Sequence, residues 1–132
     1  MSAAEVAAIK ARIAGSGVTT LAVYESVPAN PTYPYVALYA GAGISTSDRE
    51  ADERIRREVA WQTTTVGVSP EQCRAALDRV NARLENWRPD VAGRTCSKVE
   101  HEDSQPMRPD ASLPDRVVFY GTDRWSTVSD PT

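Results

Sequence analysis

The sequence is poor in the residues from which most catalytic and metal sites are built. It has one histidine, His101, and two cysteines, Cys73 and Cys96, which are too few and too far apart for a zinc pattern. A Ser-His-Asp or Cys-His unit can therefore be built only around His101. In a strand, its neighbours Glu100 and Glu102 point to the opposite sheet face. We expect His101 to be a partly exposed strand residue, Cys73 to lie in the core, and the protein not to be an enzyme.

Long apolar runs and an excess of basic charge are also missing. No segment approaches the roughly 20 apolar residues of a membrane helix, and residues 1–10 lack the basic start and apolar run of a signal peptide. The formal net charge is -3 and the pI is about 5.2. Such a chain has no basic field for holding phosphate backbones. We expect a soluble protein made in the cytoplasm, with no membrane partner and no specific nucleic-acid binding.

Charged residues gather at three places without forming a recognisable site. Acidic residues cluster at 48–53 and at 100–103, but both stretches are polar, whereas acid–base catalysis needs a carboxyl group in an apolar pocket. The first cluster also lacks the spacing and closing Glu of an EF-hand calcium loop. The basic run Arg54 to Arg57 is flanked by acidic residues, which is typical of an ion-pairing surface. We therefore expect neither a cofactor nor a bound metal.

What the sequence does contain is the composition of an ordinary globular domain. Hydrophobic residues make up 41% and charged residues 25% of 132 positions, which is enough apolar surface for a core without disulfides or metals. Proline and glycine concentrate in a few stretches, which indicates long loops at 41–53 and 104–114. We expect one domain covering residues 1–132.

The strongest local signal is a strand that turns into a capped helix. Residues 57–68 alternate, with Val59 and Trp61 on one face. Ser69-Pro70-Glu71-Gln72 then supplies a cap, a proline at the first helical position and a capping-box Gln. An apolar stripe continues to Trp87, and Arg88-Pro89 stops the helix.

The remaining elements follow from the same kinds of pattern. Ser2 and Glu5 have capping-box spacing and predict a helix over 3–14. Alternation and turn residues predict further strands at 20–24, 33–40, 95–103 and from 115 onward. The tail 123–132 is expected to add a short strand around Trp125 and Val128 before fraying. The order α-β-β-β-α-β-β predicts an α+β fold, with a mainly antiparallel sheet of four to five strands and two helices packed on it.

Several short motifs, in this order and spacing, resemble one protein family. Pro34-Tyr35-Val36, Ser47-Asp48-Arg49 and Trp61-Gln62-Thr63-Thr64-Thr65-Val66-Gly67 lead into the helix that ends at Trp87-Arg88-Pro89. The later motifs are His101-Glu102-Asp103-Ser104, then Pro106, Arg108, Asp110 and Pro114, then Val118-Phe119-Tyr120 and Asp123-Arg124. From about Tyr33 onward the chain resembles the tail terminator proteins of long-tailed phages (siphoviruses) that infect actinobacteria.

The resemblance implies a structural virion protein of the tail neck region, assembled in the host cytoplasm. Such a protein forms a hexameric ring that caps the head-proximal end of the tail tube, ends tube growth and offers a docking surface to the head. Its partners are its own copies, the tail tube protein and a head–tail connector or head-completion protein, with DNA passing through the ring. The loops 41–53 and 104–114 are expected to face these partners. The expected interface residues are Ser47, Asp48, Arg49, Arg54, Arg56, Arg108 and Asp110.

Two other functions remain open at this point. Another neck or head–tail completion protein shares the size, the α+β character and the lack of catalytic motifs. A small α+β enzyme or ligand-binding domain is the alternative from a different class, and a deep apolar pocket near His101 favours it.

Overall fold

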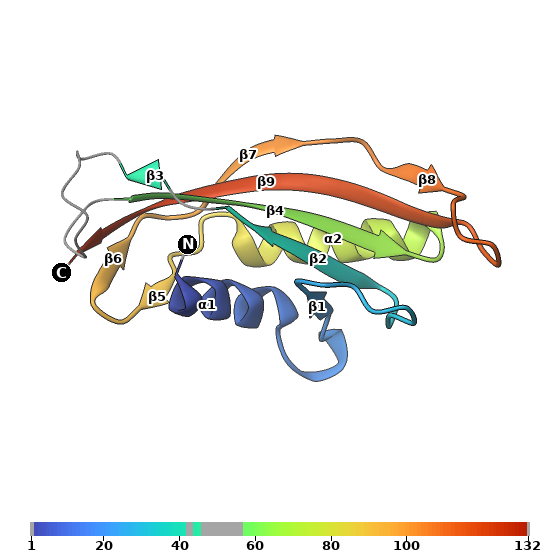
Figure 1. Cartoon of the computed structure of the whole chain (residues 1–132), viewed down its shortest axis with the longest axis horizontal. Coiled ribbons are helices and arrows are strands. Elements are labelled where there is room, and N and C mark those ends of the chain that lie inside the picture. The colour runs from blue at the N-terminus through green and yellow to red at the C-terminus, as the bar shows by residue number, and fades with distance from the viewer. Residues whose placement is uncertain (1, 42–43, 46–56, 132) are drawn as a thin grey trace.

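The computed structural model describes residues 2–41, 44–45 and 57–131, and it contains two helices and one large sheet (Figure 1). The helices are α1 (Ala3–Ala14) and α2 (Pro70–Leu84), and a short 3-10 helix, η1 (Gly17–Thr19), follows α1. The strands are β1 (Ala22–Tyr24), β2 (Tyr35–Ala40), β3 (Ile44–Ser45), β4 (Arg57–Gly67), β5 (Asp90–Val91), β6 (Arg94–Cys96), β7 (Glu100–Ser104), β8 (Arg108–Asp110) and β9 (Val118–Pro131). The predicted α+β class is confirmed.

The sheet is built around β4 and β9, which pair antiparallel over eleven residues, from Arg57 opposite Ser129 to Gly67 opposite Phe119. On the other side of β4 lies β2, and β1 joins β2 in parallel, while all other pairs are antiparallel. On the side of β9 away from β4, the three strands β6, β7 and β8 pair with β9 one after another along its length. The sheet is therefore mainly antiparallel, as predicted, but within the described residues it has nine strands, more than the four to five expected.

Both helices begin where the sequence signals predict. In α1, Glu5 N donates to Ser2 Oγ and Ser2 N donates to Glu5 Oε1, which completes the capping box. In α2, Ser69 accepts from Gln72 N, and Gln72 Oε1 accepts from Val68 N. The second helix ends at Leu84, three residues before Trp87, and Trp87 packs against the core from outside the helix.

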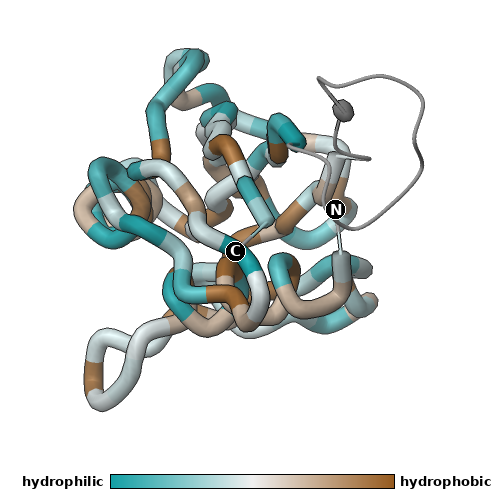
Figure 2. The backbone as a smooth tube through the Cα atoms, turned by 90° about the vertical axis from the view of Figure 1, so that its left-hand side faces the viewer, coloured by the Kyte–Doolittle hydropathy of each residue, from teal (hydrophilic) through white to brown (hydrophobic). Residues whose placement is uncertain are grey.

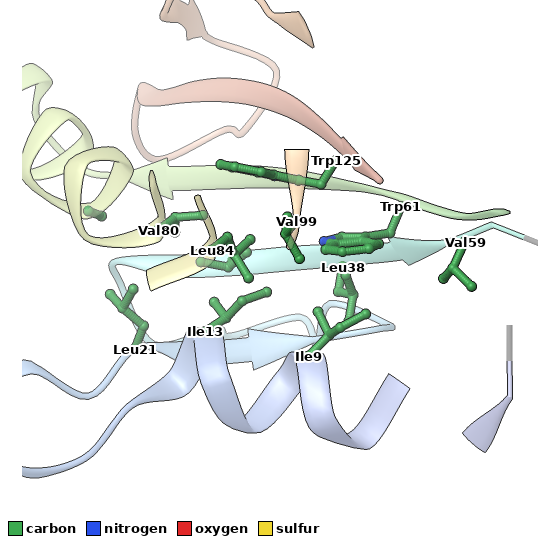
Figure 3. Packing of buried hydrophobic residues seen from close by; sticks show 12 residues of the cluster. Ile9, Ile13, Leu21, Leu38, Val59, Trp61, Val80, Leu84, Val99 and Trp125 are labelled. Carbon is green, nitrogen blue, oxygen red and sulfur yellow. The ribbon is translucent and has the colours of Figure 1, made fainter. Parts of the chain in front are cut away.

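The helices cover one face of the sheet and enclose the core. Helix α2 packs on β4 and β9, and α1 packs on α2. Seen from the end, the hydrophobic stretches lie mainly in the interior and the hydrophilic stretches on the outer loops (Figure 2). Figure 3 shows the side chains that meet there, from both helices and the central strands. The cluster consists of Ile9, Ile13, Leu21, Val36, Leu38, Val59, Trp61, Ala76, Val80, Leu84, Val99 and Trp125.

The register decides which strand residues face the helices. Trp61 lies opposite Trp125 and Thr63 opposite Asp123, and directly opposed residues of an antiparallel pair share a face. Gly121, on the same face, approaches the Leu77 side chain of α2 closely, which identifies this face as the one that the helices cover. The other face carries the alternate residues of each strand, among them Gln62 and Arg124.

Three predictions about the second half of the chain are wrong. The tail does not fray after a short strand, because β9 runs without interruption to Pro131. The expected loop at 104–114 contains β8, which pairs with β9. The expected strand at 95–103 is broken at 97–99, where Ser97 and Val99 bond instead to Val128 and to Trp87. The predicted loop at 41–53 contains β3, and the rest of it lies mostly outside the described residues.

Among the described residues, neither helix is long and apolar enough to cross a membrane.

An ion pair between a buried glutamate and a partly exposed arginine connects the start of α1 to the sheet. Glu5 is 3% exposed, and its Oε1 lies 3.5 Å from Nη2 of Arg57 on β4. Burial by itself raises the pKa of this carboxyl group, but the hydrogen bonds from Ser2 and the charge of Arg57 outweigh it, so the pKa is lowered. The ionised form of Glu5 is therefore favoured in the folded state.

This shift predicts a pH-dependent contribution to stability. A carboxyl group with a lowered folded pKa stabilises the protein above its ordinary pKa, and the contribution is lost as the pH falls through the folded pKa. We expect Glu5→Gln to lower the Tm at pH 7, and the difference from wild type to shrink below pH 4. Thermal unfolding at both pH values measures this. The control is Glu71→Gln, which removes an exposed carboxylate from the first turn of α2; a Glu5→Gln effect independent of pH contradicts the prediction.

Candidate interface surfaces

Of the expected interface residues, the structure describes Arg108 and Asp110. They are two residues apart on β8, so they share a side of the strand, opposite Tyr120 and Val118 of β9. Arg108 is exposed. The backbone N–H of Ser112 donates to Asp110 Oδ1 at 2.9 Å, and this bond lowers the pKa of Asp110. The structure thus brings this pair together. Ser47, Asp48, Arg49, Arg54 and Arg56 lie outside the described residues.

One end of the sheet carries a group of exposed hydrophobic side chains. Val68 follows β4 and Val117 precedes β9, and the register of Gly67 opposite Phe119 places both at the same end. Val27 and Leu113 line a hollow of about 440 Å³ formed by the chain segments 27–35 and 113–116. We call Val27, Val68, Leu113 and Val117, which are between 39% and 46% exposed, the apolar end. Exposed hydrophobic side chains that gather at one end of a fold are candidates for a protein contact.

An arginine connects the two segments that form this hollow. The guanidinium carbon of Arg116 lies 5.5 Å from the ring centroid of Tyr33, a cation–π distance. Tyr33 in turn lies 5.4 Å from Tyr35, and Tyr35 lies 5.6 Å from Tyr24, measured between ring centroids. The three tyrosines therefore form a continuous aromatic group beneath the apolar end. The sequence alone does not predict this surface, because Val27, Val68, Leu113 and Val117 are far apart along the chain.

A second hollow lies on the polar side of the sheet. It has a volume of about 580 Å³ and is lined by residues of β2, β4, β7 and β9. From β2 the lining includes Tyr39, which is 52% exposed. The charged residues of the lining include Glu102 and Asp103 of β7 and Arg124 of β9. The lining is mixed in charge and open to solvent, unlike the apolar pocket of a small-molecule site.

His101 is held in a network that reaches into the core. Its side chain is 24% exposed, and its Nε2 lies 2.8 Å from Oδ1 of Asp123, which is 1% exposed. The imidazole stacks on Trp125 with ring centroids 4.2 Å apart, and Trp125 Nε1 donates to Thr63 Oγ1 at 3.0 Å. His101 is thus a partly exposed strand residue, as predicted. Sequence reasoning missed its partner, because only the strand register brings Asp123 beside it.

The contacts of the His101 side chain can be compared with those of a catalytic histidine. A histidine and a buried aspartate are two members of a hydrolytic triad, but the histidine must also contact a nucleophile. Among the described residues, the only hydrogen bond recorded for the His101 ring is the one to Asp123. The two thiols are buried, and burial raises the pKa of both Cys73 and Cys96, which keeps them protonated. The prediction that Cys73 is a core residue is confirmed.

No protein-family model and no curated protein sequence matches this chain. A search of solved structures finds a chain of a structure described as "Virion of native gene transfer agent (GTA) particle". The two folds agree with a TM-score of 0.66 at 15% sequence identity, and the match covers 97% of this chain and 99% of that chain. At this identity the likeness establishes a shared fold over nearly the full length of both chains.

Proposed function

We propose that this protein is a structural component of a phage-like virion, and specifically a tail terminator. In this role several copies, expected to be six, form a ring on the head-proximal end of the tail tube. The ring stops addition of further tube subunits and provides the surface on which the head docks. The observation that carries the proposal is the nearly full-length likeness to a virion protein chain. The sequence motifs that resemble tail terminators point to the same role.

The surfaces of the fold are compatible with ring assembly. A ring needs a heterologous contact, in which two different patches of each subunit meet. The apolar end offers exposed hydrophobic surface, and the β8 pair Arg108 and Asp110 offers charged groups on the polar side of the sheet. The free edge of β7 and β8 offers unpaired strand, among the residues that the structure describes. The fold therefore has the distinct patches that a ring requires.

The proposed function is tested by disrupting the gene in the phage that encodes the protein. We expect tails of abnormal, variable length in electron micrographs, because tube growth no longer stops at the head-proximal end. Complementation with the wild-type gene is the control and restores uniform tails. Normal unattached tails with leaking heads indicate a head-closure protein instead, and normal intact particles exclude both roles.

A biochemical test addresses the ring directly. The purified full-length chain is measured by mass determination in solution, alone and mixed with tail tubes of the same phage. We expect a closed oligomer, either alone or on the tube ends, and an end to tube elongation when the protein is added. Continued elongation with the protein still monomeric contradicts the proposal.

A further inference from the structure

The loop between α1 and β1 presents one fully exposed hydrophobic side chain. Val18 lies in η1, and the loop projects from the body of the molecule below the helix layer (Figure 1). Exposed valines are common on protein surfaces, so exposure alone indicates little. What distinguishes Val18 is the way in which the surrounding loop is held.

The loop is fixed by Arg83, which reaches across from α2. Its Nη1 donates to the carbonyl of Ile13 at 2.7 Å, and its Nη2 donates to the carbonyl of Thr19 at 2.8 Å. The loop closes on itself as well, because Thr20 Oγ1 donates to the carbonyl of Gly17 at 2.7 Å. Gly15, at a φ of +67°, leaves room for the guanidinium, since a Cβ there meets Arg83 Cζ at 2.7 Å. Such a preorganised loop loses little conformational freedom on binding.

Three arginines lie at or beside this loop, and none of them forms an ion pair with another residue that the structure describes. Arg12 Nε donates to the carbonyl of Arg83, and Arg79 lies four residues before Arg83 on the same face of α2. Burial first, and then the charges of Arg79 and Arg12, lower the pKa of Arg83. None of the ion pairs recorded among the described residues includes these three side chains. We call Val18, Arg12, Arg79 and Arg83 the Val18 surface.

The complementary charge lies on the opposite side of the molecule. Strand β7 runs along the side of the sheet away from α1 (Figure 1), and in the described residues its only partner strand is β9. Its residues Glu100, Glu102 and Asp103 are exposed, and within the described parts of the chain none forms a salt bridge, although Arg124 of β9 lies opposite Asp103. We call these three residues the acidic edge. Each subunit therefore carries three arginines on one side and, among the described residues, three exposed carboxylates along the opposite edge.

We propose that the Val18 surface of one subunit docks on the acidic edge of a second copy of this chain. The inference rests on the proposed ring and specifies its subunit contact. In this contact two different patches, on opposite sides of the subunit, meet, so the contact is head-to-tail. Such contacts close into a ring when the rotation that relates neighbouring subunits adds up to a full turn. Complementary charge fixes the register of such a contact and suppresses wrong pairings. The guanidinium carbon of Arg12 also lies 5.5 Å from the ring centroid of Trp87, a cation–π distance, and Arg and Trp are both enriched at interface hot spots.

Charge reversal at the two surfaces tests the proposal. Arg79→Glu and Glu102→Arg each place like charges across the contact, and we expect each to raise the concentration needed for half-assembly by about tenfold or more. Arg79 is chosen over Arg83 because Arg83 holds the loop by hydrogen bonds, whereas Arg79 forms none with the residues that the structure describes. The control is Arg74→Glu, the same change on the same helix, five residues and about 140° around from Arg79; we expect it to assemble like wild type. Far-ultraviolet circular dichroism verifies the fold of each variant.

Mixing the two variants identifies the partner. In an equimolar mixture the reversed Val18 surface of Arg79→Glu meets the reversed acidic edge of Glu102→Arg, and the two unchanged surfaces meet each other. We therefore expect the mixture to assemble into rings of alternating subunits at wild-type concentrations, at which neither variant assembles alone. Assembly of the single variants at wild-type concentrations overturns the inference while leaving the ring itself intact. Failure of the mixture overturns the acidic edge as the partner surface. If wild type stays monomeric with and without tail tubes, the proposed function fails, and this inference fails with it.

Discussion

Replacement of Trp125 by alanine is expected to lower the free energy of unfolding by about 3–5 kcal/mol. The side chain is 1% exposed and is the largest fully buried one in the described structure. It lies opposite Trp61 on β4, stacks on His101 and donates to Thr63 Oγ1. The alanine variant leaves a cavity between β4, β9 and β7, and it removes the hydrogen bond that Trp125 donates to the Thr63 hydroxyl group. Urea unfolding followed by circular dichroism measures the loss.

Two milder variants separate the parts of this effect. Trp125→Phe keeps an aromatic ring in contact with His101 but removes the indole N–H, so the Thr63 hydroxyl loses its partner. We expect a loss of about 1–3 kcal/mol, smaller than for alanine. His101→Ala removes the stack and the Asp123 contact from a partly exposed position, and it leaves the Asp123 carboxylate buried. If Trp125→Ala costs no more than Trp125→Phe, packing of the indole is not what stabilises this part of the core.

Replacement of Gly67 by alanine is expected to have the second largest effect. A Cβ at this position lies 2.7 Å from the backbone nitrogen and 2.9 Å from the Cα of Cys73, in the first turn of α2. Backbone atoms cannot rotate away as a side chain does, so the helix must move relative to β4. Overpacking of this kind costs typically 1–3 kcal/mol and sometimes more, and we expect the upper part of that range. Denaturant unfolding measures the change.

Two other glycines provide matched controls for this prediction. At Gly121 an added Cβ meets Leu77 Cδ1 at 2.8 Å, and this end of a flexible side chain can change its rotamer. At Gly93 nothing lies within 4 Å, but φ is +77°, so alanine there carries only backbone strain of about 1 kcal/mol. We expect the order Gly67→Ala, Gly121→Ala, Gly93→Ala in decreasing destabilisation. A Gly67→Ala variant as stable as Gly93→Ala contradicts the proposed clash.

The sequence by itself determined the elements whose signals are local. The capping pairs Ser2–Glu5 and Ser69–Gln72 predict the starts of both helices, because a cap depends on residues three positions apart. The alternation of Val59 and Trp61 predicts the buried face of β4, because successive side chains of a strand point to opposite faces of the sheet. The break at Arg88-Pro89 marks the end of α2 only approximately, since the helix stops at Leu84 and the chain continues as a turn through Asn86, whose φ is +62°.

Only the tertiary structure decided the remaining sheet and its surfaces. The inward residues of β9 include Asp123, Thr127 and Ser129, so the strand lacks an apolar alternation. These polar groups are buried because His101, Ser97 and Arg94, brought alongside by β6, β7 and the segment between them, supply their hydrogen bonds. No local pattern reports such partners, since each is at least 22 residues away.

The candidate interfaces depend on the same kind of long-range information. Of the expected interface residues, Arg108 and Asp110 are brought together because β8 adds to the edge of β9, where a loop was predicted. The apolar end and the Val18 surface were not predicted. The first requires two distant segments to meet, and the second requires Arg83 to reach across to the carbonyl of Ile13, 70 residues away in sequence. Local spacing therefore determined where helices and the central strand form, and packing between distant segments decided which side chains remain exposed for partners.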